Sequence, residues 1–187
     1  SRLSKYHSDL RGKSVGIVGC GSLGSKVATS LARCGVGAFI IVDDDVLFDG
    51  NLVRNDLDLR SVGFPKTIGL QDRIFWINPE TEITPYSLRL GGQESSTYTS
   101  QVMSALARCD LILDATAEPS VFNLCGSIAR RHKVPFAWAE VFEGGIGGMI
   151  ARLLPDEHPV PHLARAQMSD WLKDTQPEWQ ANTGPDP

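Results

Sequence analysis

A glycine-rich turn is the first stretch of this sequence whose residue types and spacing could do chemistry. The turn, GCGSLG at residues 19–24, follows a short apolar run and precedes apolar residues at helical spacing. Gly19 permits a tight turn, Gly21 lets a phosphate approach the backbone, and Gly24 lets a helix pack closely on a strand. A helix that begins here presents free N–H groups and the positive end of its dipole to an anion. The pattern therefore predicts a nucleotide phosphate site that includes Gly19, Gly21, Ser22, Leu23 and Gly24.

Asp43 supplies a second group suited to a nucleotide. It stands 19 residues after Gly24, at the end of the next apolar run. An acid at this distance from a glycine-rich turn hydrogen-bonds a ribose hydroxyl in nucleotide-binding strand–helix–strand units. The alternative is a solvated acid at a strand end, but the motif context favours the ribose ligand. These two features alone also fit a nicotinamide-dependent oxidoreductase.

The polar segment from Asp43 to Lys66 favours ATP over a nicotinamide cofactor. It supplies Asn51, Arg54 and Lys66, for which a dehydrogenase has no evident need. Arginine offers a planar fork to phosphate oxygens and lysine a compact charge, so two cations suit a triphosphate. The alternative is that both are surface cations in weak ion pairs with Asp56 or Asp58.

Alternating strand and helix patterns are expected to position these groups. Together they predict an α/β fold, a Rossmann-like doubly wound, mainly parallel sheet with helices on both faces. Ligands of such sheets bind at the carboxyl ends of the strands, where Asp43, Asp45 and Asp114 would lie. We expect strands at 14–18, 39–42, 82–86, 111–114 and 134–139, and another after EGGIGG. Helices are expected from 22, over 65–77, ending at 102–107 and from 119, with a hydrophilic connection at 91–101.

Length and charge set the broad class. The chain has 187 residues, and its net charge of −4 offers no basic face for nucleic acid or an anionic membrane. The absence of a signal peptide and of an 18-residue apolar run predicts a cytoplasmic protein. We expect one domain over 1–155 and a Pro-rich tail or crossover-loop segment over 156–187, with one helix that carries Met168 and Trp171. The start at Ser1 suggests a piece of a longer protein.

Five motifs occur in the order and approximate spacing of a known family. The stretches GCGSLG, DDDVLFDGNLVRN, GFPK, INP and LILDAT resemble GxGxxG, D-x-D-x-V-x-x-x-N-L-x-R-Q, G-x-x-K, NP and D-x-T-D-N-x-x-x-R. These motifs mark the adenylation domain of the ThiF/MoeB/HesA superfamily, to which ubiquitin-activating enzymes belong. The resemblance covers about Gly12 to Pro155. In its NLVRN segment the chain resembles bacterial members of the family that are fused to, or encoded with, ubiquitin-like and deubiquitinase-like proteins.

The resemblance implies an activity and the residues that perform it. The C-terminal carboxylate of a ubiquitin-like or sulfur-carrier protein would attack the α-phosphate of ATP, giving an acyl-adenylate and pyrophosphate. Asp43 would hold the ribose beside Asp45, while Asn51 and the catalytic Arg54 and Lys66 would surround the phosphates. A carboxylate is already ionised at neutral pH, so the site needs only positioning and cationic stabilisation. Mg²⁺ would share the charge, with Asp114 as its ligand, and the protein would be a homodimer.

The last motif departs from the family pattern. Ala117 stands where the family has a magnesium-coordinating aspartate, Phe122 where it has arginine, and Asn55 replaces glutamine. Asp114 or Glu118 would then have to supply the oxygen ligand. These departures leave open a non-catalytic scaffold of the same fold that binds nucleotide or a partner protein.

Overall fold

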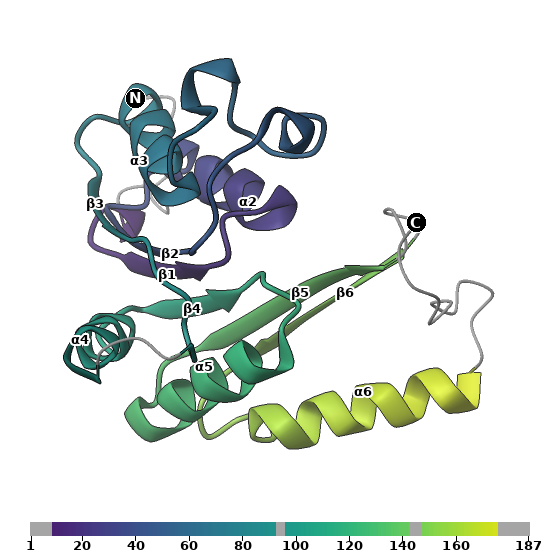
Figure 1. The fold of residues 1–187 in the computed structure, drawn as a ribbon. Helices are drawn as coiled ribbons and strands as arrows, with labels where there is room; N and C mark the ends of the chain where they lie inside the picture. The colour runs from purple at the N-terminus through teal and green to yellow at the C-terminus, as the bar shows by residue number, and fades with distance from the viewer. Residues whose placement is uncertain (1–8, 93–95, 143–146, 176–187) are drawn as a thin grey trace.

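A six-stranded sheet forms the centre of the molecule (Figure 1). The computed structural model describes residues 9–92, 96–142 and 147–175. The strand order is β3-β2-β1-β4-β5-β6, in which the first five strands are parallel and β6 pairs antiparallel with β5. The fold therefore confirms the predicted α/β, mainly parallel sheet. The strands are β1 (Ser14–Val18), β2 (Ala38–Val42), β3 (Glu82–Tyr86), β4 (Leu111–Asp114), β5 (Phe136–Phe142) and β6 (Gly147–Leu153).

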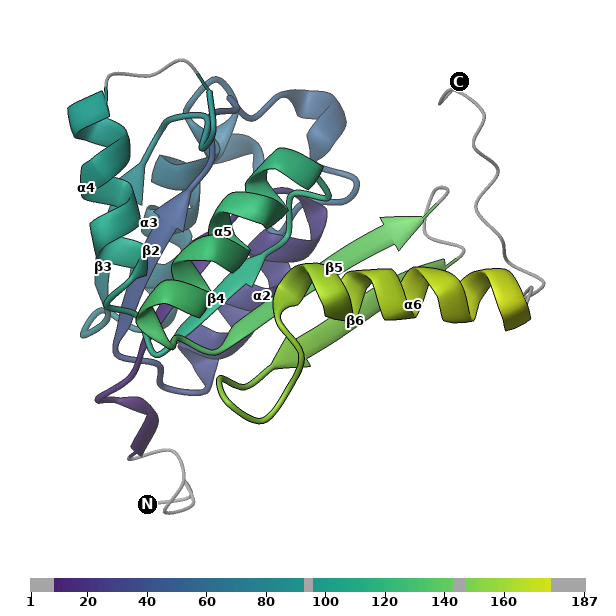
Figure 2. The ribbon, with the colours of Figure 1, turned by 90° about the horizontal axis from the view of Figure 1, so that it is seen from below.

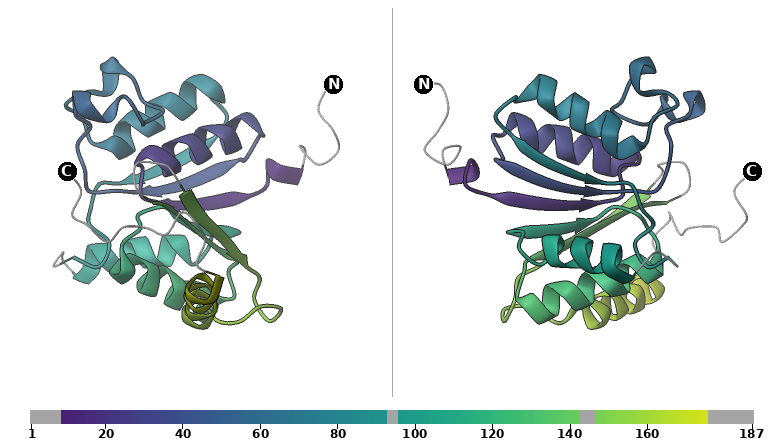
Figure 3. Two further views of the ribbon diagram at one scale, coloured as in Figure 1. Left: turned by 90° about the vertical axis from the view of Figure 1, so that its right-hand side faces the viewer. Right: turned by 60° about the vertical axis from the view of Figure 1, so that its left-hand side comes forward.

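Helices cover both faces of the sheet (Figures 1 and 3). On one face lie α2 (Ser22–Arg33) and α3 (Lys66–Ile77), and on the other lie α4 (Ser96–Leu106), α5 (Pro119–His132) and α6 (Pro161–Thr175). Because both faces are covered, the inner strands are apolar on both sides rather than alternating. The first layer buries Ile17, Phe39, Leu70 and Ile74, and the second buries Ile112, Val121, Phe136 and Trp138. Two short 3₁₀ turns, Asp49–Asn51 and Leu59–Ser61, lie in the segment between β2 and α3.

The connection predicted at 91–101 is wrong over its second half, because α4 begins at Ser96. Thr97, Tyr98 and Gln101 are exposed, so the first turns of this helix show no apolar periodicity. Its buried side begins only at Val102 and continues to Leu106. Packing of that later stretch stabilises the helix, and the polar residues before it extend the same helix toward its N-terminus.

The helix predicted after residue 156 is α6, which lies alongside the β5–β6 hairpin (Figure 2). Ala164 is buried in the same cluster as Phe136 and Trp138, and Met168 packs against that cluster. The domain boundary at 155 stays a prediction. Parts of two other predictions, the turn at EGGIGG and the tail, fall on 143–146 and 176–187, which lie outside the described residues. Within the described part of the chain, no helix has the length and apolar character needed to cross a membrane.

Candidate functional site

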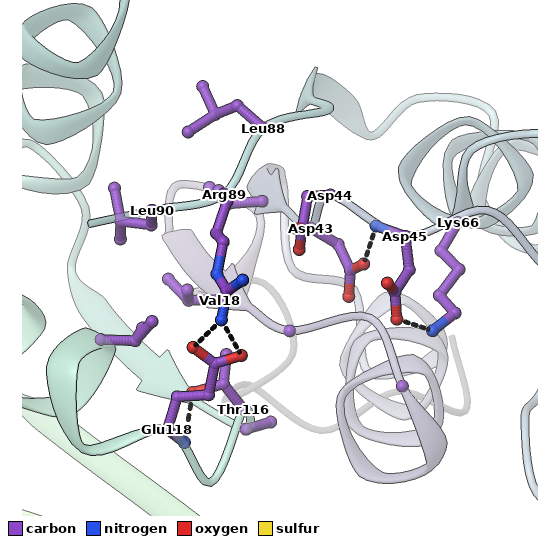
Figure 4. Close-up of a pocket in the computed structure, with 15 residues that line it drawn as sticks. Val18, Asp43, Asp44, Asp45, Lys66, Leu88, Arg89, Leu90, Thr116 and Glu118 are labelled. Atoms are coloured by element: carbon purple, nitrogen blue, oxygen red, sulfur yellow. Dashed lines mark hydrogen bonds and ion pairs between the residues drawn. The ribbon is translucent and has the colours of Figure 1, made fainter. Parts of the chain in front are cut away.

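A cleft of about 250 Å³ lies at the carboxyl ends of β1, β2 and β4 (Figure 4). One side is formed by the backbone at Gly19 and Gly21, by residues 43–45 and by Lys66. The other side comes from the segment after β3 and the turn after β4. The fold thus brings the glycine turn together with Asp43 and Asp45, two of the three strand-end carboxylates expected at this edge. The residues of this second side are Leu88, Arg89, Leu90, Ala115, Thr116, Glu118 and Val121.

The three glycines of the turn differ in what a side chain at each position would meet. Gly19 has φ +90°, and a Cβ there would lie 2.9 Å from the carbonyl carbon of Ala115. A Cβ on Gly24 would lie 1.8 Å from the carbonyl oxygen of Gly19, so close helix–strand packing excludes it. A Cβ on Gly21, which lines the cleft, would meet nothing within 4 Å. Packing within the protein does not require glycine at residue 21, but a ligand against the backbone there would.

The first turn of α2 begins at this glycine. Gly21 is its N-cap, no side chain in the described structure caps it, and its first turn holds no acid. The first N–H groups of a helix have no partner within the helix and attract an anion. Ser22 and Leu23 belong to this turn, although neither side chain lines the cleft. The Ser22 hydroxyl donates instead to the carbonyl of Arg54 at 3.0 Å.

Asp43 is fixed by the backbone on both of its carboxylate oxygens. Oδ2 accepts a hydrogen bond from the N–H of Cys20 at 2.5 Å, and Oδ1 accepts one from the N–H of Asp45 at 2.8 Å. Burial raises the pKa of Asp43, while the two N–H donors and the charge of Lys66 lower it. The carboxylate thus joins the glycine turn to the end of β2 and presents oriented acceptors to the cleft.

Lys66, the first residue of α3, brings a positive charge to the cleft from a buried position. It is 7% exposed, and its Nζ lies 2.5 Å from Oδ2 of Asp45. The side chain of Asp45 is 64% exposed, so the lysine is enclosed while its partner is not. A buried cation needs a counter-charge, and an anion in the cleft could replace Asp45 in that role.

The loop that carries Asn51 and Arg54 folds onto α2, but neither side chain lines the cleft. Arg54 is exposed, and its carbonyl accepts hydrogen bonds from Ser22 and from the amine of Lys26. Oδ1 of Asn51 accepts from the N–H of Phe48 at 3.1 Å, and Nδ2 of Asn55 donates to the carbonyl of Cys20 at 3.1 Å. Contact of Asn51 and Arg54 with phosphate therefore stays a prediction. The carboxylates proposed as alternative partners are taken by other arginines, Asp58 by Arg60 and Asp56 by Arg73.

Asp114 lies behind the cleft rather than in its wall. It is 3% exposed, and its Oδ1 accepts from both the N–H and the hydroxyl of Thr116, at 3.0 and 2.7 Å. The Thr116 hydroxyl oxygen in turn accepts from the N–H of Glu118 at 3.1 Å. Asp114 thus shapes the turn after β4, and the carboxylate that this turn presents to the cleft is Glu118.

Arg89 lines the cleft but was not predicted from the sequence. Its Nη2 lies 3.2 Å from Oε2 of Glu118, and this ion pair links the two segments on one side of the cleft (Figure 4). Arg89 comes three residues after the end of β3, at the same edge as Asp43. Its position could have indicated a site residue, because a cation just past the end of a parallel strand lies at the edge where all these strand ends meet.

Carboxylates suited to a cation are grouped at the end of β2. Among the described residues, the group of ligand-type side chains whose oxygens come within 4.8 Å of one another is Asp43, Asp44 and Asp45. Asp114 is not part of it. Cys20, buried beneath this group, has a thiol pKa raised well above its usual value, chiefly by burial, so the thiol stays protonated.

Ala117 adopts a left-handed backbone conformation with φ +59°. This conformation costs a residue with a Cβ about 1–2 kcal/mol, and glycine avoids most of that cost. We expect Ala117→Gly to raise the free energy of unfolding by about 1 kcal/mol in urea denaturation. Ala166→Gly, at an exposed position in α6, is the control and should lower stability by about 1 kcal/mol. Equal losses in both variants would contradict strain at Ala117.

Comparison with known proteins finds, over most of the chain, the family that the sequence motifs resemble. Residues 4–176 match the ThiF family. The sulfur carrier protein ThiS adenylyltransferase of Escherichia coli is 30% identical over 140 residues, which cover 74% of this chain and 52% of that protein. The ATP-dependent ubiquitin transferase-like protein Cap2 of Enterobacter hormaechei is 35% identical over 116 residues, 62% of this chain and 18% of its own length.

A solved structure shows the same fold. The crystal structure of E. coli MccB with ATP matches with a TM-score of 0.72 at 19% identity, covering 95% of this chain and 52% of that one. This chain thus spans about half, or less, of the length of these three relatives. The likeness to MccB at this identity concerns the fold.

Proposed function

Because the chain belongs to the ThiF family, we propose that it carries out ATP-dependent adenylation of the C-terminal carboxylate of a ubiquitin-like or sulfur-carrier protein. The observation that carries this proposal is the cleft in which Gly21, Asp43 and Lys66 meet. Its relatives include a protein named for adenylating the sulfur carrier ThiS and one described as ubiquitin transferase-like. The MccB structure contains ATP on the same fold.

In this proposal each residue of the cleft has one task. Asp43 accepts hydrogen bonds from ribose hydroxyls, using oxygens that the backbone already orients. Gly21 and the first N–H groups of α2 receive phosphate oxygens. When ATP binds, Lys66 leaves its ion pair with Asp45, pairs with the phosphates and neutralises part of their charge.

The reaction needs no general base from this chain. An oxygen of the ionised carrier carboxylate attacks the α-phosphorus of ATP, and the bond to the bridging oxygen of pyrophosphate breaks. The cleft contributes by holding the α-phosphate in line with the incoming carboxylate. Arg54 is exposed in the loop whose backbone contacts Ser22 at the start of α2, and in this proposal it lies at the phosphate end of the site together with Asn51.

The metal belongs to the proposal as well. Mg²⁺ supplies charge neutralisation on the phosphates and prefers oxygen ligands while it keeps several waters. The carboxylates that face the cleft are those of residues 43–45 and Glu118. Asp114 is enclosed and bonded to Thr116, so Glu118 is the better placed of the two ligands considered for the last motif.

ATP–pyrophosphate exchange tests this function directly. With a carrier protein ending in glycine, encoded beside this chain, labelled pyrophosphate should enter ATP only when the carrier is present. A carrier that lacks its terminal glycine is the control. Binding of ATP without exchange under these conditions would contradict catalysis. Sedimentation of the same sample tests the expected homodimer.

A second candidate, nucleotide binding without turnover, is favoured by Ala117. At this position the family motif has an aspartate, and the left-handed backbone there would suit Asp better than Ala. If catalysis was lost with that aspartate, Ala117→Asp should create carrier-dependent exchange in an otherwise inactive protein. Exchange by the unchanged protein excludes this candidate. No exchange in either protein, with ATP still bound, supports a scaffold.

A further inference from the structure

A partly buried ion pair joins α6 to β5, and the proposed reaction makes no use of it. Nη2 of Arg165, on α6, lies 2.5 Å from Oε1 of Glu140, on β5, and the two side chains are 26% and 13% exposed. The guanidinium carbon also lies 4.6 Å from the centre of the Phe122 ring. Enclosing two charges has a high desolvation cost that only good geometry offsets, so this pair calls for an explanation.

Asp114 is the third charge in this cluster. In the parallel pairing of β4 with β5 it stands opposite Trp138, and Glu140 follows Trp138 by two residues. Side chains two residues apart share a face, so both carboxylates lie on the side covered by α5 and α6. Burial raises the pKa of both Asp114 and Glu140, and the charge of Arg165 lowers both. The guanidinium of Arg165 thus pairs with Glu140, and its charge also acts on Asp114 on the same face of the sheet.

Asp114 connects this cluster to the cleft. Its Oδ1 accepts two hydrogen bonds from Thr116, and the Thr116 hydroxyl oxygen accepts the N–H of Glu118. Thr116 and Glu118 both line the cleft. Hydrogen bonds to an ionised acceptor are stronger than neutral ones, so the geometry of this turn depends on Asp114 and on what surrounds it.

We propose that Arg165 is a positioning residue of the cleft: from α6 the charge of its guanidinium stabilises the carboxylate of Asp114 and, through the bonds of Asp114 to Thr116, the turn 114–118 that forms part of one wall. The guanidinium stacks on Phe122, which stands where the family motif has arginine. The positive charge beside Phe122 thus comes from α6, which lies in the segment that was expected to be a tail or crossover loop. The effect of Arg165 on the turn is inferred from the structure alone, whereas its effect on ATP affinity rests on the proposed function.

The test separates this role from simple structural support. Arg165→Met leaves the partly buried Glu140 without its partner, so the melting temperature of this variant should fall. Glu140→Gln/Arg165→Met removes both members of the pair and should recover most of that loss. Hydrogen exchange at the Thr116 amide, followed without nucleotide, and ATP affinity from calorimetry are then compared between Glu140→Gln and the double variant. Lys173→Met, which breaks an exposed pair on the same helix, is the control.

We expect the double variant to exchange the Thr116 amide about 10-fold faster than Glu140→Gln, because the turn opens more readily. Its ATP affinity should be about 10-fold lower, a difference of about 1.4 kcal/mol, and Arg165→Lys should retain part of both. Equal exchange and equal affinity in Glu140→Gln and the double variant would overturn the proposal. If Arg165→Met does not fold, the double variant carries the comparison. Faster exchange in a protein that never binds ATP would support the role of Arg165 and refute the proposed function.

Discussion

Lys66→Met is expected to reduce carrier-dependent ATP–pyrophosphate exchange by about 100- to 1,000-fold, the range found when an enzyme loses one preorganised donor to a developing negative charge. Lys66 is 7% exposed, and its amine contacts Asp45 on the same side of the cleft. Water screens a charge in this position poorly, so its interaction with phosphate is stronger than that of a surface lysine. Methionine keeps the apolar stem and removes only the charge.

The matched control is Lys133→Met, which removes a lysine from an exposed ion pair with Asp156. That change should leave exchange within about 2-fold of the unchanged protein, because exposed pairs contribute little. Lys66→Met also removes the counter-charge of Asp45, so its melting temperature must be measured with the rate. A stable Lys66→Met protein with full exchange would show that the phosphates lie elsewhere.

The fold and one side of the cleft could be predicted because local sequence determines them. The bounds of β1, β3 and β4 follow from short apolar runs between turn residues, and the structure has them where they were expected. Gly19, Gly21, Asp43 and Lys66 lie at chain positions where a parallel sheet must bring them to one edge. Spacing along the chain is enough for that inference.

The second side could not be predicted in the same way, because it depends on tertiary contacts. Arg89 was missed since its partner Glu118 is 29 residues away, on a different segment. Asp114 was expected at the metal, and that role stays a prediction; its burial and its bonds to Thr116 are tertiary features that the sequence does not show. The link from Arg165 to this wall depends on how α6 lies on the sheet, which no residue pattern in that region shows.

Replacement of Gly21 should separate nucleotide binding from stability. Gly21→Asp places a carboxylate at the N-cap of α2, a position with φ −73° where no side chain of the described structure acts as a cap. Aspartate is preferred over glycine at an N-cap, so the free energy of unfolding should stay equal or rise by a few tenths of a kcal/mol. The same carboxylate would occupy the N–H groups proposed for phosphate and repel it. We expect ATP affinity to fall about 100-fold, or about 2.7 kcal/mol.

Gly24→Ala should show the opposite pattern, because its Cβ would lie 1.8 Å from the backbone oxygen of Gly19 and outside the cleft. Relief of that contact requires a backbone shift, which should cost about 1–3 kcal/mol of stability. Gly24→Ala should therefore lose less ATP affinity than Gly21→Asp, because it only displaces the turn and adds no charge to the cleft. If Gly21→Asp binds ATP as well as the unchanged protein, the phosphates do not reach α2. The glycine at residue 21, which protein packing does not require, would then have no explanation in nucleotide binding.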